Sequence, residues 1–173
     1  MISGLGLDHA EVVVELGPGT GAITGAILRR PAPGARLVAV ELNPVFARRL
    51  ADRYQGSAVE VVQDCAEDLA TLVPNRVDVI VSGLPWTVTP HERQRRILDA
   101  AVGSLATSGR FSTFAYVHAA WTPPVRRCAA ELAARFSAVE RSRVVWPNVP
   151  PAYVHRAALP CHKRPPTTAS GTP

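Results

Sequence analysis

The sequence predicts an α/β fold, a doubly wound and mostly parallel sheet of seven strands with an antiparallel hairpin at its C-terminal end. Short valine-rich runs alternate with longer segments of helical periodicity, as in βα units whose strands are buried on both faces. A glycine-rich turn, VVVELGPGTG at 12–21, follows the first run and leads into a helical segment. The last two runs are joined by a link too short for a crossover helix, which predicts the hairpin.

The strand-like runs come in two groups. The parallel group is predicted at 12–16, 37–41, 58–62, 77–82 and 110–116. The hairpin group is predicted at 139–146 and 152–158, around the link Pro147-Asn148-Val149-Pro150-Pro151.

Three helices have recognisable starts. Asn43-Pro44 is a good N-cap and first-turn pair for a helix that extends to about Tyr54. Thr89-Pro90-His91-Glu92 is typical of a capping box, and Thr122-Pro123 opens the third helix. The inward face of the second helix is predicted to carry Ile97, Leu98, Ala101, Val102 and Leu105, and that of the third Val125, Cys128, Ala129, Leu132 and Phe136.

Length and composition predict one folded domain. The chain has 173 residues, 47% of them hydrophobic, which is enough for a single core. We expect this domain to span 1–159, and the proline-rich segment 160–173 to be a disordered tail. Only eleven residues precede the first predicted strand.

Charge is divided unevenly along the chain. Residues 1–90 carry a net charge of −3 and residues 91–173 a net charge of +8. A basic half favours an anionic partner, such as a phosphate backbone or a lipid surface, although solvated arginines would look the same. The three cysteines form no CxxC pair, and no long apolar run or signal peptide is recognisable. We therefore expect a cytoplasmic protein with no metal site, able to lie peripherally on the inner face of the membrane.

The glycine-rich turn predicts a nucleotide-like ligand. Glycines at 17, 19 and 21 let the backbone turn sharply and approach a ligand closely. Glu41 ends the second strand, where a carboxylate can accept hydrogen bonds from a ribose diol. A dinucleotide would place a pyrophosphate beside Glu15, whereas S-adenosylmethionine brings an ammonium and a sulfonium there. The acid before the glycines favours the methyl donor, but the looser dinucleotide pattern is also satisfied.

Together these motifs resemble the class I S-adenosylmethionine-dependent methyltransferases, which have a Rossmann-like fold. Segment 15–21 is similar to their first motif, 38–43 to their ribose-binding acidic motif, 61–69 to their adenine-binding motif and 77–86 to their acceptor-side motif. The resemblance implies that Asp64 accepts from the adenine amino group and that the Cys65 backbone N–H meets a ring nitrogen. It implies S-adenosyl-L-methionine as cofactor, bound by Glu15, Gly17, Pro18, Gly19, Thr20, Gly21, Glu41, Leu42, Asp64, Cys65, Ser82, Gly83 and Leu84.

The acceptor-side motif narrows the substrate. Amino-directed nucleic-acid methyltransferases, including the rRNA adenine dimethyltransferases, usually carry Asn-Leu-Pro-Tyr, where this chain has Gly83-Leu84-Pro85-Trp86. Bacterial phospholipid N-methyltransferases are more similar, because they carry Ser-Gly-Leu-Pro here and a Trp-x-Asn-x-Pro-Pro-Ala-aromatic-Val segment like VVWPNVPPAYVHRA at 144–157. This likeness implies N-methylation of phosphatidylethanolamine-type headgroups, with an rRNA adenine N6-dimethyltransferase-like activity as the alternative. Related enzymes also place a helical segment before the first strand, so we expect a shortened form.

Two residues are predicted to act on the acceptor. The face of Trp86 can hold a methylated ammonium by cation–π attraction, or else cover the cofactor as a hydrophobic lid. Tyr153 is a candidate general base, with His91 and His155 as alternatives of the right type. Trp146 and Asn148 are expected at the acceptor mouth, and Trp121 as a helix anchor. Arginines at 93, 95, 96, 126, 127, 141 and 143 would face a phospholipid substrate at an anionic membrane surface, with RNA the less favoured partner.

Overall fold

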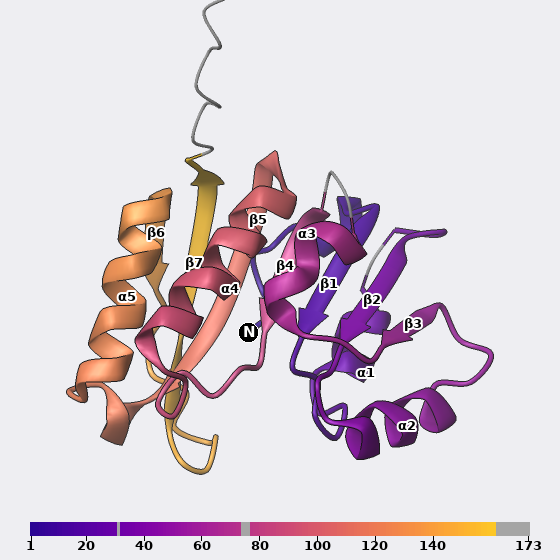
Figure 1. The fold of residues 1–173 in the computed structure, drawn as a ribbon, viewed down its shortest axis with the longest axis horizontal. Helices are drawn as coiled ribbons and strands as arrows, with labels where there is room; N and C mark the ends of the chain where they lie inside the picture. Colours follow the sequence, from indigo (N-terminus) through magenta and orange to yellow (C-terminus); the bar gives the residue numbers. More distant parts are fainter. Residues whose placement is uncertain (31, 74–76, 162–173) are drawn as a thin grey trace, which may run out of the picture.

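The computed structural model describes residues 1–30, 32–73 and 77–161. Seven strands form one sheet in the order β3-β2-β1-β4-β5-β7-β6 (Figure 1). The strands are β1 Val12–Leu16, β2 Arg36–Val40, β3 Val59–Val62, β4 Val77–Ser82, β5 Leu105–Tyr116, β6 Phe136–Arg141 and β7 Ala152–Pro160. Strands β1 to β5 pair in parallel, and β7 pairs antiparallel with both β5 and β6. The predicted fold class is therefore confirmed.

Helices cover both faces of the sheet. The α-helices are α1 Thr24–Leu28, α2 Pro44–Arg53, α3 Leu69–Leu72, α4 His91–Ser104 and α5 Pro123–Arg135, and the 3-10 helices are η1 Leu7–His9, η2 Ala66–Asp68 and η3 Val117–Ala119. The larger core cluster joins α3, α4 and α5 to one face. The N-terminal segment and α1 cover the other face, where Leu5 and Leu7 are buried against β1 and β4. No helix among the described residues is long and apolar enough to cross a membrane.

Two predicted helix starts hold, and the capping box is wrong. Asn43 caps α2, because its Oδ1 accepts hydrogen bonds from the Val45 and Phe46 backbone N–H groups. Thr122 is the N-cap residue of α5. The N-cap of α4 is Pro90, one residue later than predicted, and no side chain caps this helix. Thr89 instead donates its hydroxyl to Pro85 O, 3.0 Å away, inside the preceding loop.

The C-terminal strands differ from the prediction in their ends. Phe136, predicted on the inward face of a helix, begins β6 and packs against Phe111 with 5.9 Å between ring centroids. The strand predicted at 139–146 therefore ends at Arg141, and only an isolated bridge from Val145 to Ala152 continues the pairing. Strand β7 continues to Pro160, two residues beyond its predicted end. Most of the predicted tail, 162–173, lies outside the described residues.

Candidate active site

Three predicted motifs meet at the carboxyl edge of the parallel strands. The backbone N–H of Gly17 donates to Val40 O, and that of Gly83 donates to Leu16 O. The N–H of Glu41 donates to Val62 O in the same way. Each loop thus leaves the sheet directly beside its neighbour, so the glycine-rich turn, the ribose-type acid and the acceptor-side motif share one site.

The glycine-rich turn needs glycine for two physical reasons. Gly17, Gly19 and Gly21 have φ angles of +67°, +56° and +80°, in the left-handed region that side chains disfavour. A Cβ at Gly17 would also lie 2.8 Å from Leu84 Cδ2, so this glycine permits close packing against the acceptor-side loop.

Glu41 holds the turn in place from the end of β2. Its Oε2 accepts a hydrogen bond from Gly19 N and its Oε1 one from Asn43 N, both at 2.9 Å. An ionised carboxylate offers about four acceptor positions, so two remain for a diol. Glu41 can therefore fix the loop and accept from a ribose at the same time.

Glu15 is a buried carboxyl group beneath the turn, and one of its oxygens accepts no hydrogen bond from the described residues. Its exposure is 1%, and this oxygen is Oε2. Burial raises the pKa of Glu15 to about 7, an effect that the Thr24 hydroxyl opposes and the Glu41 carboxylate reinforces. Thr24 Oγ1 makes no hydrogen bond of good geometry in the described chain. Its hydroxyl therefore lowers the pKa of Glu15 as a nearby dipole. A cationic ligand group above Glu15 would supply the missing partner.

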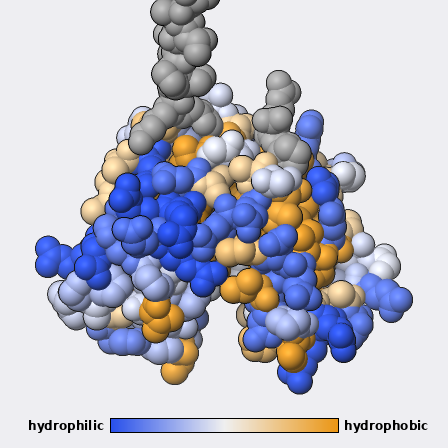
Figure 2. All heavy atoms as spheres, in the orientation of Figure 1, coloured by the Kyte–Doolittle hydropathy of each residue, from blue (hydrophilic) through white to orange (hydrophobic). Residues whose placement is uncertain are grey.

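A cavity of about 770 Å³ opens at this edge, within the usual range for ligand sites. Its walls include eight of the predicted site residues: Gly17, Gly19, Glu41, Leu42, Asp64, Gly83, Leu84 and Trp86. The other predicted cofactor residues do not line it: Glu15, Pro18, Thr20, Gly21, Cys65 and Ser82. Figure 2 shows the lower edge of the molecule divided by a notch into two lobes.

The adenine-type corner has a local hydrogen bond that the sequence does not reveal. The Cys65 backbone N–H, predicted to meet a ring nitrogen, donates to Asp64 Oδ1 at 2.7 Å. Cys65 Sγ lies 3.3 Å from Arg93 Nη2, and Arg93 Nε donates to Glu67 Oε1. The Cys65 N–H can reach a ligand only when the Asp64 carboxylate turns away from it.

Trp86 is held rigidly in the cavity wall. It is 4% exposed, and its indole Nε1 donates to Thr113 Oγ1 at 2.6 Å. The Thr113 hydroxyl in turn donates to Ser82 O. Gln94, fully buried in α4, donates its amide to Trp86 O at 2.8 Å and to Thr89 O at 3.1 Å. The sequence alone does not identify Thr113 or Gln94. The one signal for them is that each is a polar residue on the buried, otherwise apolar face of its strand or helix.

The second predicted acceptor residue, Tyr153, does not line the cavity. Its ring packs with Ala115, Ala119 and Val125, and the Arg141 guanidinium lies 5.2 Å from the ring centroid. Burial raises the pKa of Tyr153, and Arg141 opposes that rise. Its role as a base stays a prediction, and its placement behind the cavity wall gives it no support.

The other proposed acid–base and mouth residues are also dispersed. His91 lies 2.8 Å from Glu131 on the outer side of α4. Burial lowers the pKa of His155, which stacks edge-on against Tyr153. Trp146 and Asn148 lie in the exposed β6–β7 link, where Asn148 donates to Pro150 O.

The predicted arginine face separates into two groups. Arg93 and Arg96 both bind Glu67, and Arg95 lies 4.0 Å from Glu131. Among the described residues, no carboxylate forms a salt bridge with the second group, Arg126, Arg127, Arg141 and Arg143.

The chain is similar in sequence to known proteins. Residues 13–109 match a family model described as "Methyltransferase domain". Among curated proteins, an ornithine lipid N-methyltransferase of Singulisphaera acidiphila is 40% identical over 110 residues, which cover 61% of this chain and 57% of the relative. A ribosomal RNA small subunit methyltransferase A of Acidobacterium capsulatum is 37% identical over 93 residues, 51% of this chain and 32% of the relative.

Solved structures agree at the level of the fold. The N-methyltransferase NodS of Bradyrhizobium japonicum, in complex with S-adenosyl-L-homocysteine, superposes with a TM-score of 0.72 at 18% identity. The match covers 90% of this chain and 82% of NodS. By contrast, the chain spans little more than half the length of the ornithine lipid enzyme and about a third of the rRNA enzyme.

Proposed function

Because the chain belongs to the methyltransferase-domain family, we propose that it methylates the primary amine of a lipid headgroup, of the phosphatidylethanolamine type. The predicted cofactor, S-adenosyl-L-methionine, is confirmed by the family match. The ornithine lipid relative supports a lipid amine as acceptor. Ornithine and ethanolamine headgroups both present a primary amine, so the two acceptors share one chemistry.

The observation that carries the choice of acceptor is the packing of Gly83. A Cβ at this position would lie 2.7 Å from Gly17 O, a backbone atom that cannot move aside without disturbing the glycine-rich turn. An asparagine side chain, which the nucleic-acid enzymes usually carry here, therefore has no room. Without that amide, the site lacks a side-chain acceptor for the exocyclic amine of a base, whereas a flexible alkyl amine needs none.

The cavity suits a displacement at a methyl carbon. The bound cofactor supplies a methyl group on a positively charged sulfonium. The chain then has to hold a neutral amine in line behind that carbon and exclude water. Leu84, Pro85 and Trp86 form a rigid, largely apolar wall for this purpose. The fixed indole face of Trp86 can hold the resulting methylated ammonium with about 0.5–2 kcal/mol.

Transfer of labelled methyl groups tests the proposal. The full chain is incubated with labelled S-adenosylmethionine and one of three acceptors: phosphatidylethanolamine in detergent micelles, ornithine lipid in the same micelles, or undermethylated rRNA. We expect label in lipid, and the two lipid arms distinguish the headgroups. Label in RNA alone rejects the proposal. Glu41→Ala, which removes the carboxylate that binds Gly19, is the inactive control.

An RNA adenine methyltransferase is the second candidate, supported by the identity to the rRNA enzyme across half of the chain. The match covers only 32% of the rRNA enzyme, and both reactions need the same cofactor-binding fold, so this identity does not choose between the acceptors. The Gly83→Asn variant separates the candidates: we expect it to lose cofactor affinity, because its side chain collides with Gly17 O. If Gly83→Asn binds cofactor normally and methylates rRNA better than the unchanged chain, the RNA activity is favoured.

A further inference from the structure

Large exposed apolar side chains gather at one end of the molecule. Seven of the eight in the described chain lie beyond the carboxyl ends of β2, β4 and β5 or in the β6–β7 link. The exception is Leu159, which lies near the end of β7, at the opposite ends of the strands from the cavity. The seven are Leu42, Val45, Val88, Trp121, Val145, Trp146 and Val149, and we call them the apolar rim.

Part of the apolar rim borders the cavity. Leu42 and Val88 belong both to the rim and to the cavity lining. The loops that carry Trp121 and Val149 are neighbours, because Val117 N donates to Pro151 O at 2.9 Å. Figure 1 shows the β6–β7 link and the start of α5 at the same lower edge as the loops after β1 and β4, and Figure 2 shows hydrophobic residues on both lobes beside the notch.

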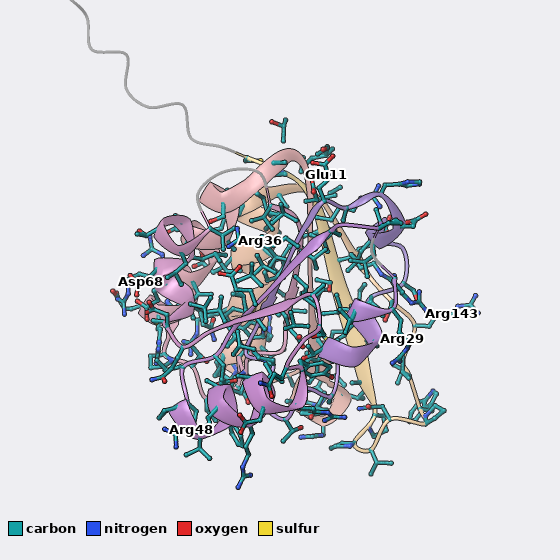
Figure 3. The ribbon with its side chains drawn as sticks, turned by 90° about the vertical axis from the view of Figure 1, so that its right-hand side faces the viewer. Glu11, Arg29, Arg36, Arg48, Asp68 and Arg143 are labelled. Carbon is teal, nitrogen blue, oxygen red and sulfur yellow. The ribbon has the colours of Figure 1, made fainter. Side chains whose placement is uncertain are left out.

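Basic residues border this rim on the α5 side. Segments 117–130 and 141–152 together contain four arginines and no aspartate or glutamate. Arg126 and Arg127 are exposed in the second turn of α5, and no salt bridge ties them to a carboxylate of the described chain. Arg143 extends sideways from the fold at the base of the β6–β7 link (Figure 3). The rim therefore combines apolar side chains with unneutralised positive charge.

We propose that the apolar rim and Arg126 and Arg127 dock the protein on an anionic lipid bilayer, with the cavity mouth turned towards the headgroups. This inference rests on the proposed function and names the surface that would deliver a lipid amine to the site. Tryptophan and arginine are both favoured at membrane interfaces, because indole rings sit among the headgroups and arginines are attracted to anionic lipids.

The aliphatic residues of the apolar rim favour a bilayer over RNA as the partner of this surface. Val149 is 93% exposed and Val88 76% exposed. Such side chains gain by entering the acyl boundary of a bilayer, whereas they can neither stack on bases nor bind phosphates. An RNA-binding surface would explain the arginines but not the valines around the mouth.

Sedimentation with lipid vesicles tests the surface. The full chain is mixed with phosphatidylcholine vesicles that contain or lack phosphatidylglycerol, and the bound fraction is measured. We expect binding to the anionic vesicles only. Trp121→Ser/Val149→Ser should weaken binding about tenfold. Arg126→Ala/Arg127→Ala should weaken it roughly twenty-fivefold, which is about fivefold for each charge.

Matched controls carry the same chemistry elsewhere. Leu159→Ser removes the exposed apolar residue at the opposite edge, and Arg29→Ala/Arg30→Ala removes two exposed arginines at the end of α1. All variants should keep the cofactor affinity and melting temperature of the unchanged chain, because the substituted side chains are exposed and none lines the cavity.

Several outcomes overturn the inference. These are no vesicle binding by the unchanged chain, equal losses in rim and control variants, or a rim variant that loses RNA binding or self-association while still binding vesicles. The proposed function is judged separately, from label transfer to lipid dispersed in detergent micelles. Transfer in micelles without vesicle binding would reject the docking surface and leave the function standing.

Discussion

Glu15, which we propose as a binding residue, shows how a buried carboxyl group lowers the stability of the protein that carries it. Its pKa in the folded chain is about 7, compared with an ordinary value of 4.5. Between these two values the folded chain keeps a proton that the unfolded chain has lost. Stability therefore falls as pH rises from about 4.5 to about 7, and does not fall further above that.

Glu15→Gln should consequently stabilise the ligand-free chain in a pH-dependent way. We expect little change at pH 4.5 and a gain of up to about 3 kcal/mol at pH 8, because the glutamine never ionises. Urea denaturation at the two pH values measures this difference. The same variant should lose affinity for S-adenosylmethionine, and a gain that is equal at both pH values would contradict the buried-carboxyl interpretation.

Thr113 makes a second residue-scale prediction. Thr113→Val keeps the shape of this buried strand residue but removes the acceptor for the Trp86 indole N–H. An unsatisfied buried donor costs about 1–3 kcal/mol, so the variant should unfold more easily. We expect kcat to fall, because the indole loses its fixed orientation, while cofactor affinity stays unchanged. Thr113→Ser is the control that retains the hydroxyl, and normal kcat in Thr113→Val would disprove the positioning role.

The site residues differ in how far sequence could identify them. Gly17, Glu41 and Gly83 could be placed beside the cavity from sequence, because each follows a strand in a motif whose backbone requirements leave few alternatives. Thr113 and Gln94 could not, since a polar residue within an apolar run does not show what it will contact. Tyr153 is a candidate base by residue type alone, and residue type does not determine on which side of a cavity wall a ring lies.

At the scale of elements, the start of α4 is held from inside the fold and not by a capping side chain. Gln94 donates to backbone carbonyls on both sides of this start, at Trp86 and Thr89. A capping box was the natural interpretation of Thr89 and Glu92, but Thr89 belongs to the acceptor-side loop. The similar shift at β6 arose because Phe136 satisfies both a helical and a strand pattern, and its packing on Phe111 decides between them.

Gln94→Leu should therefore loosen the acceptor-side loop. The substitution leaves the carbonyls of Trp86 and Thr89 without their donor, and we expect a loss of about 1–3 kcal/mol in stability. KM for the acceptor should rise while the Kd for S-adenosylmethionine changes little, since the glycine-rich turn is untouched. Kinetics at saturating cofactor separate the two effects. Glu92→Gln, exposed in the first turn of α4, is the control, and equal changes in both variants would refute the role of Gln94.

At the scale of the whole molecule, the strand order and the uneven distribution of charge together determine which charged groups lie at the carboxyl edge of the sheet. The carboxyl edge gathers the buried acids Glu15 and Glu41 from the first half of the chain, and exposed arginines from the second half. Sequence could predict that the first five strands are parallel, because short valine-rich runs alternate with helical segments, and it could predict the charge imbalance directly. It could not show that Arg93 and Arg96 are neutralised by Glu67, because that pairing depends on how α4 lies beside η2.

This arrangement predicts that salt weakens docking on the bilayer but leaves cofactor binding nearly unchanged. Raising NaCl from about 0.05 M to about 0.5 M shortens the screening length from roughly 14 Å to roughly 4 Å. Attraction between the exposed Arg126 and Arg127 and an anionic vesicle should then fall severalfold, and with it methyl transfer to vesicle lipid. Glu15 and Glu41 are buried, so calorimetric affinity for S-adenosylmethionine should change by less than about twofold. Transfer to lipid in neutral micelles is the control, and a parallel loss there would show that salt acts on the enzyme itself and not on its attachment to the bilayer.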